Sequence, residues 1–453
     1  MRGDTAMGEP GLMQTGAFRR PGSGMTVMGD LFDGSAAARE RWMLLALAVF
    51  AFGWCGAAWR IPESTFTIDF RVFWYAGSLW LEGISPYDPG FGEGFEARFP
   101  RSDDKHPNLF YPPHAYWFAT PMALIDYHPA AILWRLGLLA AMGVGAAIIH
   151  LAEPAETRHG KAPALFLAMT GLLIAFDSLE IVIYVGQTAP LIFVGIALIA
   201  YALQRGSSIA MVAGFTLVSL KPNLTLGLIP LLFLGPRPIQ NFIILSGIAA
   251  VMFAPALAIG GLKTIGQYFA GLENYVPSNP SNGARHMTGV RHYVWLATGY
   301  DTSPTLLALV SAVVAPACGI AAARTVGRWM ALPAPVAALV ITLSISMVMV
   351  SMHDTDLVIY GVLLLLATRM SWAIGLVPVV AYLLMFASEW VVYHTDLFRH
   401  LYRHPGLNWD NLALFVLGVW VAGLLIAAAM KPGGIIQPWQ PVRDALTGQR
   451  SPG

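Results

Sequence analysis

Long apolar runs alternate with short polar connections along almost the whole chain. Apolar runs of about 20 residues are typical of helices that cross a bilayer. The pattern predicts about twelve such runs, several of them short and therefore kinked or only partly inserted. They are 43–59, 130–150, 163–176, 183–203, 207–219, 223–234, 239–260, 304–323, 333–350, 356–368, 372–393 and 411–430. We therefore predict an all-α polytopic membrane protein, with one transmembrane domain over residues 42–431.

The connections between the runs are of two kinds. One kind carries Arg158 with Lys161, Arg205, Arg237, Arg324 with Arg328, Arg369, and Lys431. The other kind is Gly186-Gln187, Lys221-Pro222-Asn223 and His353-Asp354-Thr355-Asp356. Short cytoplasmic loops carry an excess of Lys and Arg, so the first kind is predicted inside and the second outside. Residues 1–41 and 432–453 then form cytoplasmic tails, the first of them disordered and followed by a signal-anchor helix.

Three of the predicted outer loops are long, over residues 60–129, 261–303 and 394–410. We expect them to carry short helices that lie in the membrane interface. The segment Tyr111–Ile125 has to start and end outside if the alternation of the other loops holds. It is therefore predicted to be a re-entrant or surface helix, although its apolar length leaves a crossing open.

Composition supports a membrane protein and excludes one class of partner. Of the 453 residues, 56% are hydrophobic and 12% are charged, and the mean hydropathy is +0.60. A soluble domain carries about 25% charged residues. The net charge of +1 provides no basic field for nucleic acid, so membrane lipid is the expected surrounding and nucleic acid is not a partner. Cys55 and Cys318 both lie in apolar runs and are interpreted as packing residues.

Asp69 is the first candidate for chemistry. It opens the stretch TIDFRVFWYAGSLWLEGISPYDP, with Arg71 beside it, just past the first apolar run. A carboxylate at the membrane surface can reach both a lipid headgroup and a sugar hydroxyl. The alternative is that Asp69 only caps a helix beginning at Phe70, a favoured use of Asp, and the two roles can coexist.

Two predicted hairpin tips supply further candidates. Lys221, next to Pro222 and Asn223, suits an anionic headgroup as a point charge, or snorkels to nearby water. The spacing of the polar residues at the second tip is compatible with a metal site, and a hydrogen-bonded start of a helix explains it equally well. Those residues are His353, Asp354 and Asp356.

The second long outer loop holds Arg285 with His286 and Arg291 with His292. These side chains either bind a phosphate or form a solvated basic face. The chain contains no P-loop, no GxGxxG after a strand, no HExxH and no GxSxG. A nucleotide-linked donor is therefore not expected, and a lipid-linked donor is. We expect no cofactor and no metal.

Five stretches carry a resemblance to a known family. In order along nearly the whole chain they are TIDFRVFWYAGSLWLEGISPYDP, LFYPPHAYWFATPMALI, YVGQTAPLIFVGIALI, GFTLVSLKPNLTLGLIPLLF and SMHDTDLVIYGVLLLL. The chain resembles the family 87 glycosyltransferases, polytopic GT-C enzymes that take a mannosyl or related sugar from a polyprenyl phosphate. The resemblance implies a GT-C-like helical bundle, Asp69 as the catalytic base and His353 near the donor phosphate.

The expected reaction follows from these candidates. A hexosyl unit, mannosyl by the resemblance, moves with inversion from a polyprenyl-phosphate donor to a hydroxyl of a glycolipid or glycan acceptor in the cell envelope. The residues expected to hold the donor phosphate are Lys221, His353, Arg285, Arg291 and His292, and the other expected site residues are Arg71, Gln187, Asn223, Asp354 and Asp356. The site is expected on the outer, periplasmic face of the inner membrane. The rival interpretations are a transporter or flippase and a structural assembly subunit. The gathering of polar groups at one face, without an internal repeat, favours the enzyme.

Overall fold

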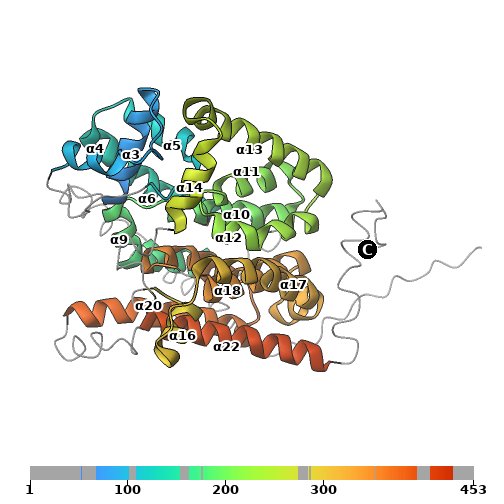
Figure 1. Ribbon diagram of the computed structural model, residues 1–453. Helices are drawn as coiled ribbons and strands as arrows, with labels where there is room; N and C mark the ends of the chain where they lie inside the picture. The colour runs from blue at the N-terminus through green and yellow to red at the C-terminus, as the bar shows by residue number, and fades with distance from the viewer. Residues whose placement is uncertain are drawn as a thin grey trace, which may run out of the picture.

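The structure is a computed structural model that describes residues 53, 68–100, 109–153, 163–174, 177–273, 284, 287–350, 352–394 and 409–431. Within these ranges the protein is helical (Figure 1), and β pairing is limited to an isolated bridge between Thr288 and Met352. The prediction of an all-α protein is confirmed for these residues.

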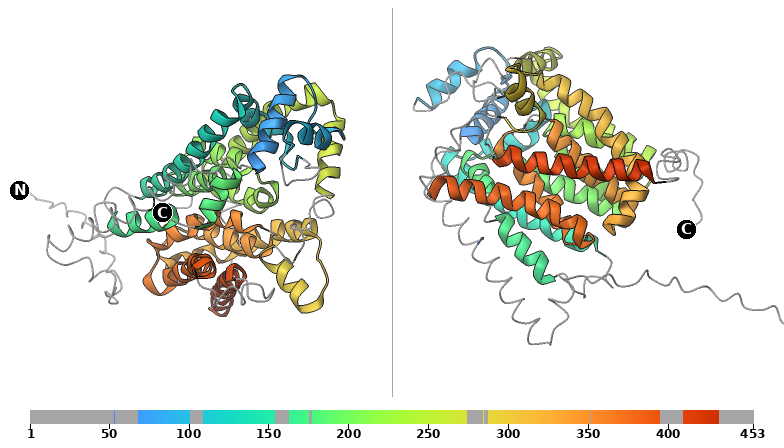
Figure 2. Two further views of the ribbon diagram at one scale, coloured as in Figure 1. Left: turned by 90° about the vertical axis from the view of Figure 1, so that its left-hand side faces the viewer. Right: turned by 90° about the horizontal axis from the view of Figure 1, so that it is seen from below.

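The helices fall into a group of short outer elements and a larger bundle. The short elements are α3 (Ile68–Leu81), α4 (Phe91–Arg98), η1 (Pro113–Ala115), α5 (Tyr116–Ala123), α14 (Lys263–Glu273) and α16 (Val290–Thr298). The bundle comprises α6 (Tyr127–Ala152), α8 (Pro163–Ile174), α9 (Asp177–Val185), α10 (Ala189–Arg205), α11 (Ser208–Val218), α12 (Pro222–Leu228), η2 (Ile229–Leu234), α13 (Pro238–Gly260), α17 (Pro304–Met330), α18 (Ala334–Met349), η5 (Asp354–Tyr360), α19 (Gly361–Ala367), α20 (Trp372–His394) and α22 (Trp409–Met430). Figures 1 and 2 show α20 and α22 running alongside each other, and these two helices pack together.

Eleven of the twelve predicted apolar runs lie on helices. The first, 43–59, lies outside the described residues except for Gly53, and both predicted tails lie outside them. Four described helices are long and apolar enough to cross a membrane alone, namely α6, α13, α17 and α22. The predicted count of about twelve crossings is therefore not confirmed. The run 183–203 shows one reason, because the chain turns at Gly186 and α10 begins only at Ala189.

The segment Tyr111–Ile125 forms only η1 and the eight-residue helix α5. At 1.5–2 Å per residue these two elements together span about 18 Å, well short of a hydrocarbon core about 30 Å thick. The two elements alone are too short to cross, and the re-entrant or surface interpretation stays a prediction.

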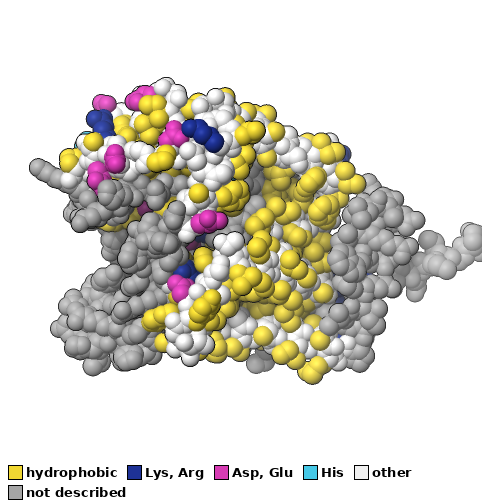
Figure 3. Space-filling view, in the orientation of Figure 1, with side chains coloured by type: hydrophobic (Ala, Val, Ile, Leu, Met, Phe, Trp, Pro, Cys, Tyr) yellow, Lys and Arg dark blue, Asp and Glu magenta, His cyan; other side chains and the backbone are white. Residues whose placement is uncertain are grey.

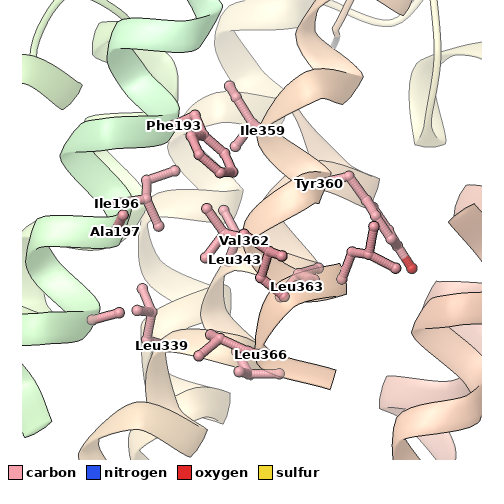
Figure 4. Close-up of a cluster of buried hydrophobic side chains, with 14 of the residues drawn as sticks. Phe193, Ile196, Ala197, Leu339, Leu343, Ile359, Tyr360, Val362, Leu363 and Leu366 are labelled. Carbon is pink, nitrogen blue, oxygen red and sulfur yellow. The ribbon is translucent and has the colours of Figure 1, made fainter. Parts of the chain in front are cut away.

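The main core lies where η5 and α19 are enclosed by the bundle. Figure 4 shows Ile359 and Val362 meeting Phe193 of α10 and Leu343 of α18, and all four side chains are fully buried. Tyr360 donates a hydrogen bond from its hydroxyl to the carbonyl of Pro378. Because this short apolar segment is surrounded by protein, the polar residues at its start are held in a fixed position.

Another face of the bundle leaves its apolar side chains exposed. Figure 3 shows hydrophobic side chains spread over the region of α13 and α17. The exposed residues there include Ile239, Phe242, Ile243, Val251, Leu306, Leu309 and Val313. Soluble monomers rarely expose an apolar surface on this scale, and it suits contact with lipid tails.

Hydrogen bonds and an ion pair connect the C-terminal ends of α6, α10 and α19. Arg369, just after α19, lies 2.8 Å from Glu153 at the end of α6 (Nε to Oε1) and donates from Nη1 to Gln204 of α10 at 3.3 Å. Arg205 donates to the carbonyls of Leu151 and Glu153. The packed helices α10 and α19 therefore bring two connections of the Arg-bearing kind to one end of the bundle, as the alternation of loops predicts.

Candidate active site

Asp69 is the second residue of α3 and is partly buried. Its carboxylate therefore lies in the first turn, where the helix dipole favours a negative charge. The aromatic part of the same helix faces inward, because Phe70, Phe73 and Trp74 are all buried. These aromatic side chains thus fix one face of α3 against the core, and Asp69 lies at the N-terminal end of the helix.

Aromatic packing fixes the start of α3. The ring of Phe70 stacks on Trp134 of α6, with centroids 5.4 Å apart and an interplanar angle of 22°. The indole N–H of Trp134 donates to the carbonyl of Gly186 at 2.8 Å. Gly186 lies so close that a Cβ there would be 2.6 Å from the Cβ of Phe70. The Gly186-Gln187 loop is therefore in direct contact with the residue next to Asp69.

Replacing Gly186 by Ala is expected to displace this contact. Gly186 has φ +81°, which disfavours any side chain, and the added Cβ would overlap Phe70. We expect the free energy of unfolding to fall by about 1–3 kcal/mol because of the strained backbone, and further because of the overlap with Phe70. Thermal unfolding of the purified protein in detergent measures it. Gly137→Ala is the control, since a Cβ there meets nothing within 4 Å; equal stability of the two variants would contradict the prediction.

Arg71 is engaged within the first outer loop. Its Nε donates to the hydroxyl of Tyr127 at 3.3 Å, and its guanidinium lies 5.6 Å from the ring centre of Phe99. The contacts position this arginine beside Asp69 on α3. A role for Arg71 in the site remains a prediction.

Lys221 and the His353 tip meet in an ion pair. The ammonium of Lys221 bonds to Oδ1 of Asp356, and Oδ2 of the same carboxylate accepts the backbone N–H of His353 at 3.1 Å. The side chain of Lys221 keeps 18% of its surface exposed, whereas that of Asp356 keeps 8%. One carboxylate thus joins two predicted phosphate-binding residues that lie far apart in the sequence.

The turn that carries Lys221 also reaches the helix that carries Asp69. Leu220 is buried in the same hydrophobic cluster as Phe70, Phe73 and Trp134. The α9 helix, which leads into Gly186, packs against both α3 and η5. The elements that carry Asp69, Lys221 and His353 therefore pack through shared neighbours, although they come from three separate parts of the chain.

The remaining residues of these tips are less informative. Gln187 donates its backbone N–H to the carbonyl of Val182 at 3.1 Å. Asn223 accepts the N–H of Leu224 at 3.0 Å in the first turn of α12. Asp354 is the first residue of η5. Their predicted parts in the site stay predictions.

In the second outer loop, Arg291 is 1% exposed and is held by Asp301. Its Nε and Nη2 donate to the two carboxylate oxygens of Asp301 at 2.7 and 2.9 Å. His292 is also buried, with Nδ1 3.1 Å from the carbonyl of Ala284. In this geometry both residues contact their own loop, and their binding to a phosphate is untested. Arg285 lies outside the described residues.

The same loop is nevertheless docked beside His353. Thr288 donates its N–H to the carbonyl of Met352 at 2.9 Å, and its hydroxyl reaches the same oxygen at 3.0 Å. Gly289 donates its N–H to Oδ1 of Asn411 at 2.8 Å. The second outer loop therefore borders the tip through its backbone.

Two buried polar residues near this region were missed in the sequence. His114 of η1 is 4% exposed, and its Nε2 lies 3.0 Å from the hydroxyl of Ser219, two residues before Lys221. Burial lowers the pKa of His114 to about 4. Arg135 is buried in α6, next to Trp134. Arg135 could have been singled out from the sequence, because an ionisable residue inside an apolar membrane run usually has a function.

Comparison with known proteins identifies the family of the chain. A sequence model described as glycosyltransferase family 87 matches residues 109–352, which is more than half of the chain. No curated protein and no solved structure was found to match the chain. The matched range includes Lys221 and Arg291 and ends just before His353.

Proposed function

The chain belongs to glycosyltransferase family 87, and from this premise we propose that it transfers a hexosyl, specifically mannosyl, unit from a polyprenyl-phosphate donor to an acceptor hydroxyl. The observation that carries the proposal is the Lys221–Asp356–His353 cluster, whose lysine follows Leu220 in the turn that packs in one core with Phe70, the neighbour of Asp69. With Asp69 it combines a carboxylate able to take a proton with a cation and a histidine suited to a phosphate.

The proposed chemistry is a single displacement. The acceptor hydroxyl attacks the anomeric carbon while the bond from that carbon to the phosphate oxygen breaks, and the leaving polyprenyl phosphate keeps the electron pair. Asp69 takes the proton of the hydroxyl, a contribution worth about 10²–10⁴ in rate. Lys221 and His353 stabilise the charge on the leaving phosphate. One attack from the face opposite the leaving group inverts the anomeric configuration.

The donor class follows from the surroundings of the site. The apolar helices indicate a membrane protein, and their exposed faces suit an isoprenoid tail. The proposed location is the inner membrane, with the site at its outer, periplasmic face, and the proposed acceptor is a glycolipid or glycan of the cell envelope. Membership of a glycosyltransferase family favours this activity over the transporter or flippase interpretation.

The test uses purified protein with labelled donors, one at a time. Polyprenyl-phosphate mannose, the corresponding glucose and galactose lipids and the matching nucleotide sugars are each incubated with a crude envelope glycolipid acceptor. Label transferred from a polyprenyl-phosphate sugar is the expected result. Transfer from nucleotide sugars alone would overturn the proposed donor.

Transfer is also expected to continue in a chelator. Both carboxylate oxygens of Asp356 are already occupied, by Lys221 and by the N–H of His353, so this tip is poorly suited to hold a divalent ion. We expect the rate with 5–10 mM EDTA, roughly the usual assay range, to stay within about twofold of the untreated rate. Loss of activity that Mg²⁺ or Mn²⁺ restores would instead assign the His353 tip to a metal.

A further inference from the structure

His114 is a polar residue in an apolar setting. Its ring packs on Phe253 of α13, with centroids 5.1 Å apart, and its side chain is almost fully enclosed. Burying an imidazole costs free energy unless its nitrogens are used. The one side-chain hydrogen bond of His114 within the described residues runs from Nε2 to Ser219.

The direction of this bond follows from the hydroxyl of Ser219. That hydroxyl donates its only proton to the carbonyl of Thr216 at 2.6 Å, so its oxygen can only accept from His114. The ring is neutral at physiological pH, because burial lowers the pKa of His114 to about 4. A neutral ring has a single N–H, which is therefore at Nε2.

Ser219 and Lys221 belong to one stiff turn. The N–H of Lys221 donates to the carbonyl of Val218 at 2.9 Å, and the hydroxyl of Thr225 contacts the carbonyls of both residues, at 2.7 Å for Val218 and 3.0 Å for Lys221. These bonds close the turn on both sides of Ser219. A shift of Ser219 is therefore transmitted to the backbone of Lys221.

We propose that His114 is a positioning residue for Lys221, holding the turn Val218–Thr225 against the outer segment so that the ammonium stays within reach of Asp356 and the donor phosphate. Only the predicted effect on the donor KM rests on the proposed function; the positioning of Lys221 does not. His114 itself touches neither donor nor acceptor. Ser219 accepts the hydrogen bond from His114 and so links it to the turn.

Two substitutions of His114 separate positioning from packing. Gln places its amide N–H where Nε2 lies and preserves the bond to Ser219, whereas the shorter Asn cannot reach. Ser219→Ala removes the acceptor itself. Losing one neutral hydrogen bond corresponds to a factor of roughly two to ten, so His114→Asn and Ser219→Ala should raise the KM for the lipid-linked donor about threefold to tenfold. The KM for the acceptor should stay unchanged, and His114→Gln should retain most of the donor affinity.

A second readout does not depend on activity. The ion pair with Asp356 shields the amine of Lys221, so reductive methylation of Lys221, followed by mass spectrometry, reports on its position. We expect His114→Asn and Ser219→Ala to accelerate this labelling about threefold to tenfold. The double variant should be no faster than either single one, because both remove the same bond. The exposed Lys263 provides the internal reference, and His128→Asn, at an exposed histidine, is the matched variant.

The outcomes separate this inference from the proposed function. Labelling of Lys221 that is unchanged in His114→Asn, or equally fast in the Gln and Asn variants, would overturn the positioning role and leave His114 as a core residue. Failure of the wild-type protein to use any polyprenyl-phosphate sugar would overturn the proposed donor, while the labelling series would still decide on His114.

Discussion

Asp69→Asn is expected to lower kcat by about 10²–10⁴ while the protein remains folded. The amide matches the carboxylate in size but cannot accept the proton of the attacking hydroxyl. The inward-facing aromatic residues of α3, led by Phe70 and its stack on Trp134, are untouched by the change. Single-turnover transfer from the labelled donor measures the chemical step, and the KM for the donor should change less than about threefold, because the phosphate is held by other residues.

The control for this prediction is Asp126→Asn. Asp126 precedes α6, is exposed and makes no capping hydrogen bond from its side chain. Its variant should transfer sugar at the wild-type rate. A near wild-type rate for Asp69→Asn as well would refute the assignment of Asp69 as base, and would leave its carboxylate with a structural role at the start of α3.

The helices were predictable because a bilayer imposes both length and composition on them. Every backbone polar group must be satisfied inside the hydrocarbon, so an apolar run of sufficient length becomes a helix. The breaks were less predictable. The run 356–368 contains no proline, yet it divides into η5 and α19 at Gly361. At that boundary Gly361 packs so closely on Leu173 and Phe193 that a side chain would not fit, and these neighbours lie outside the run itself.

Individual charged residues of the candidate site could be predicted from the sequence, but the ion pairs that they form could not. Lys221 was recognisable because an amine between two apolar runs is costly. Its partner Asp356 lies on another helix, and nothing within either stretch specifies the pairing. Arg291 shows the same limit, since its charge was visible but the carboxylate of Asp301 that engages it was not identified. His114 lies in LFYPPHAYWFATPMALI, a stretch that carries the family resemblance, and only the folded chain brings it to Ser219.

Lys221→Met is expected to impair both stability and donor use. Removing the ammonium leaves the largely buried carboxylate of Asp356 without its cation, and breaking a buried pair in this way costs up to about 3–5 kcal/mol. The variant should therefore unfold at a lower temperature in detergent. Its loss of activity alone would not show whether Lys221 contacts the donor.

The double variant Lys221→Met with Asp356→Asn resolves the two effects. The Asn oxygen can still accept the N–H of His353, and no unpaired charge remains, so the unfolding temperature should return close to the wild-type value. Donor affinity should stay about tenfold to a hundredfold weaker, because a charged hydrogen bond to the phosphate, worth about 1.5–3 kcal/mol, is still missing. Lys263→Met, which breaks the exposed pair with Asp88, should alter neither property. If the double variant instead used the donor as well as the wild-type protein, Lys221 would be a structural partner of Asp356 and the phosphate would have to be held by other groups, with His353 the first to be substituted.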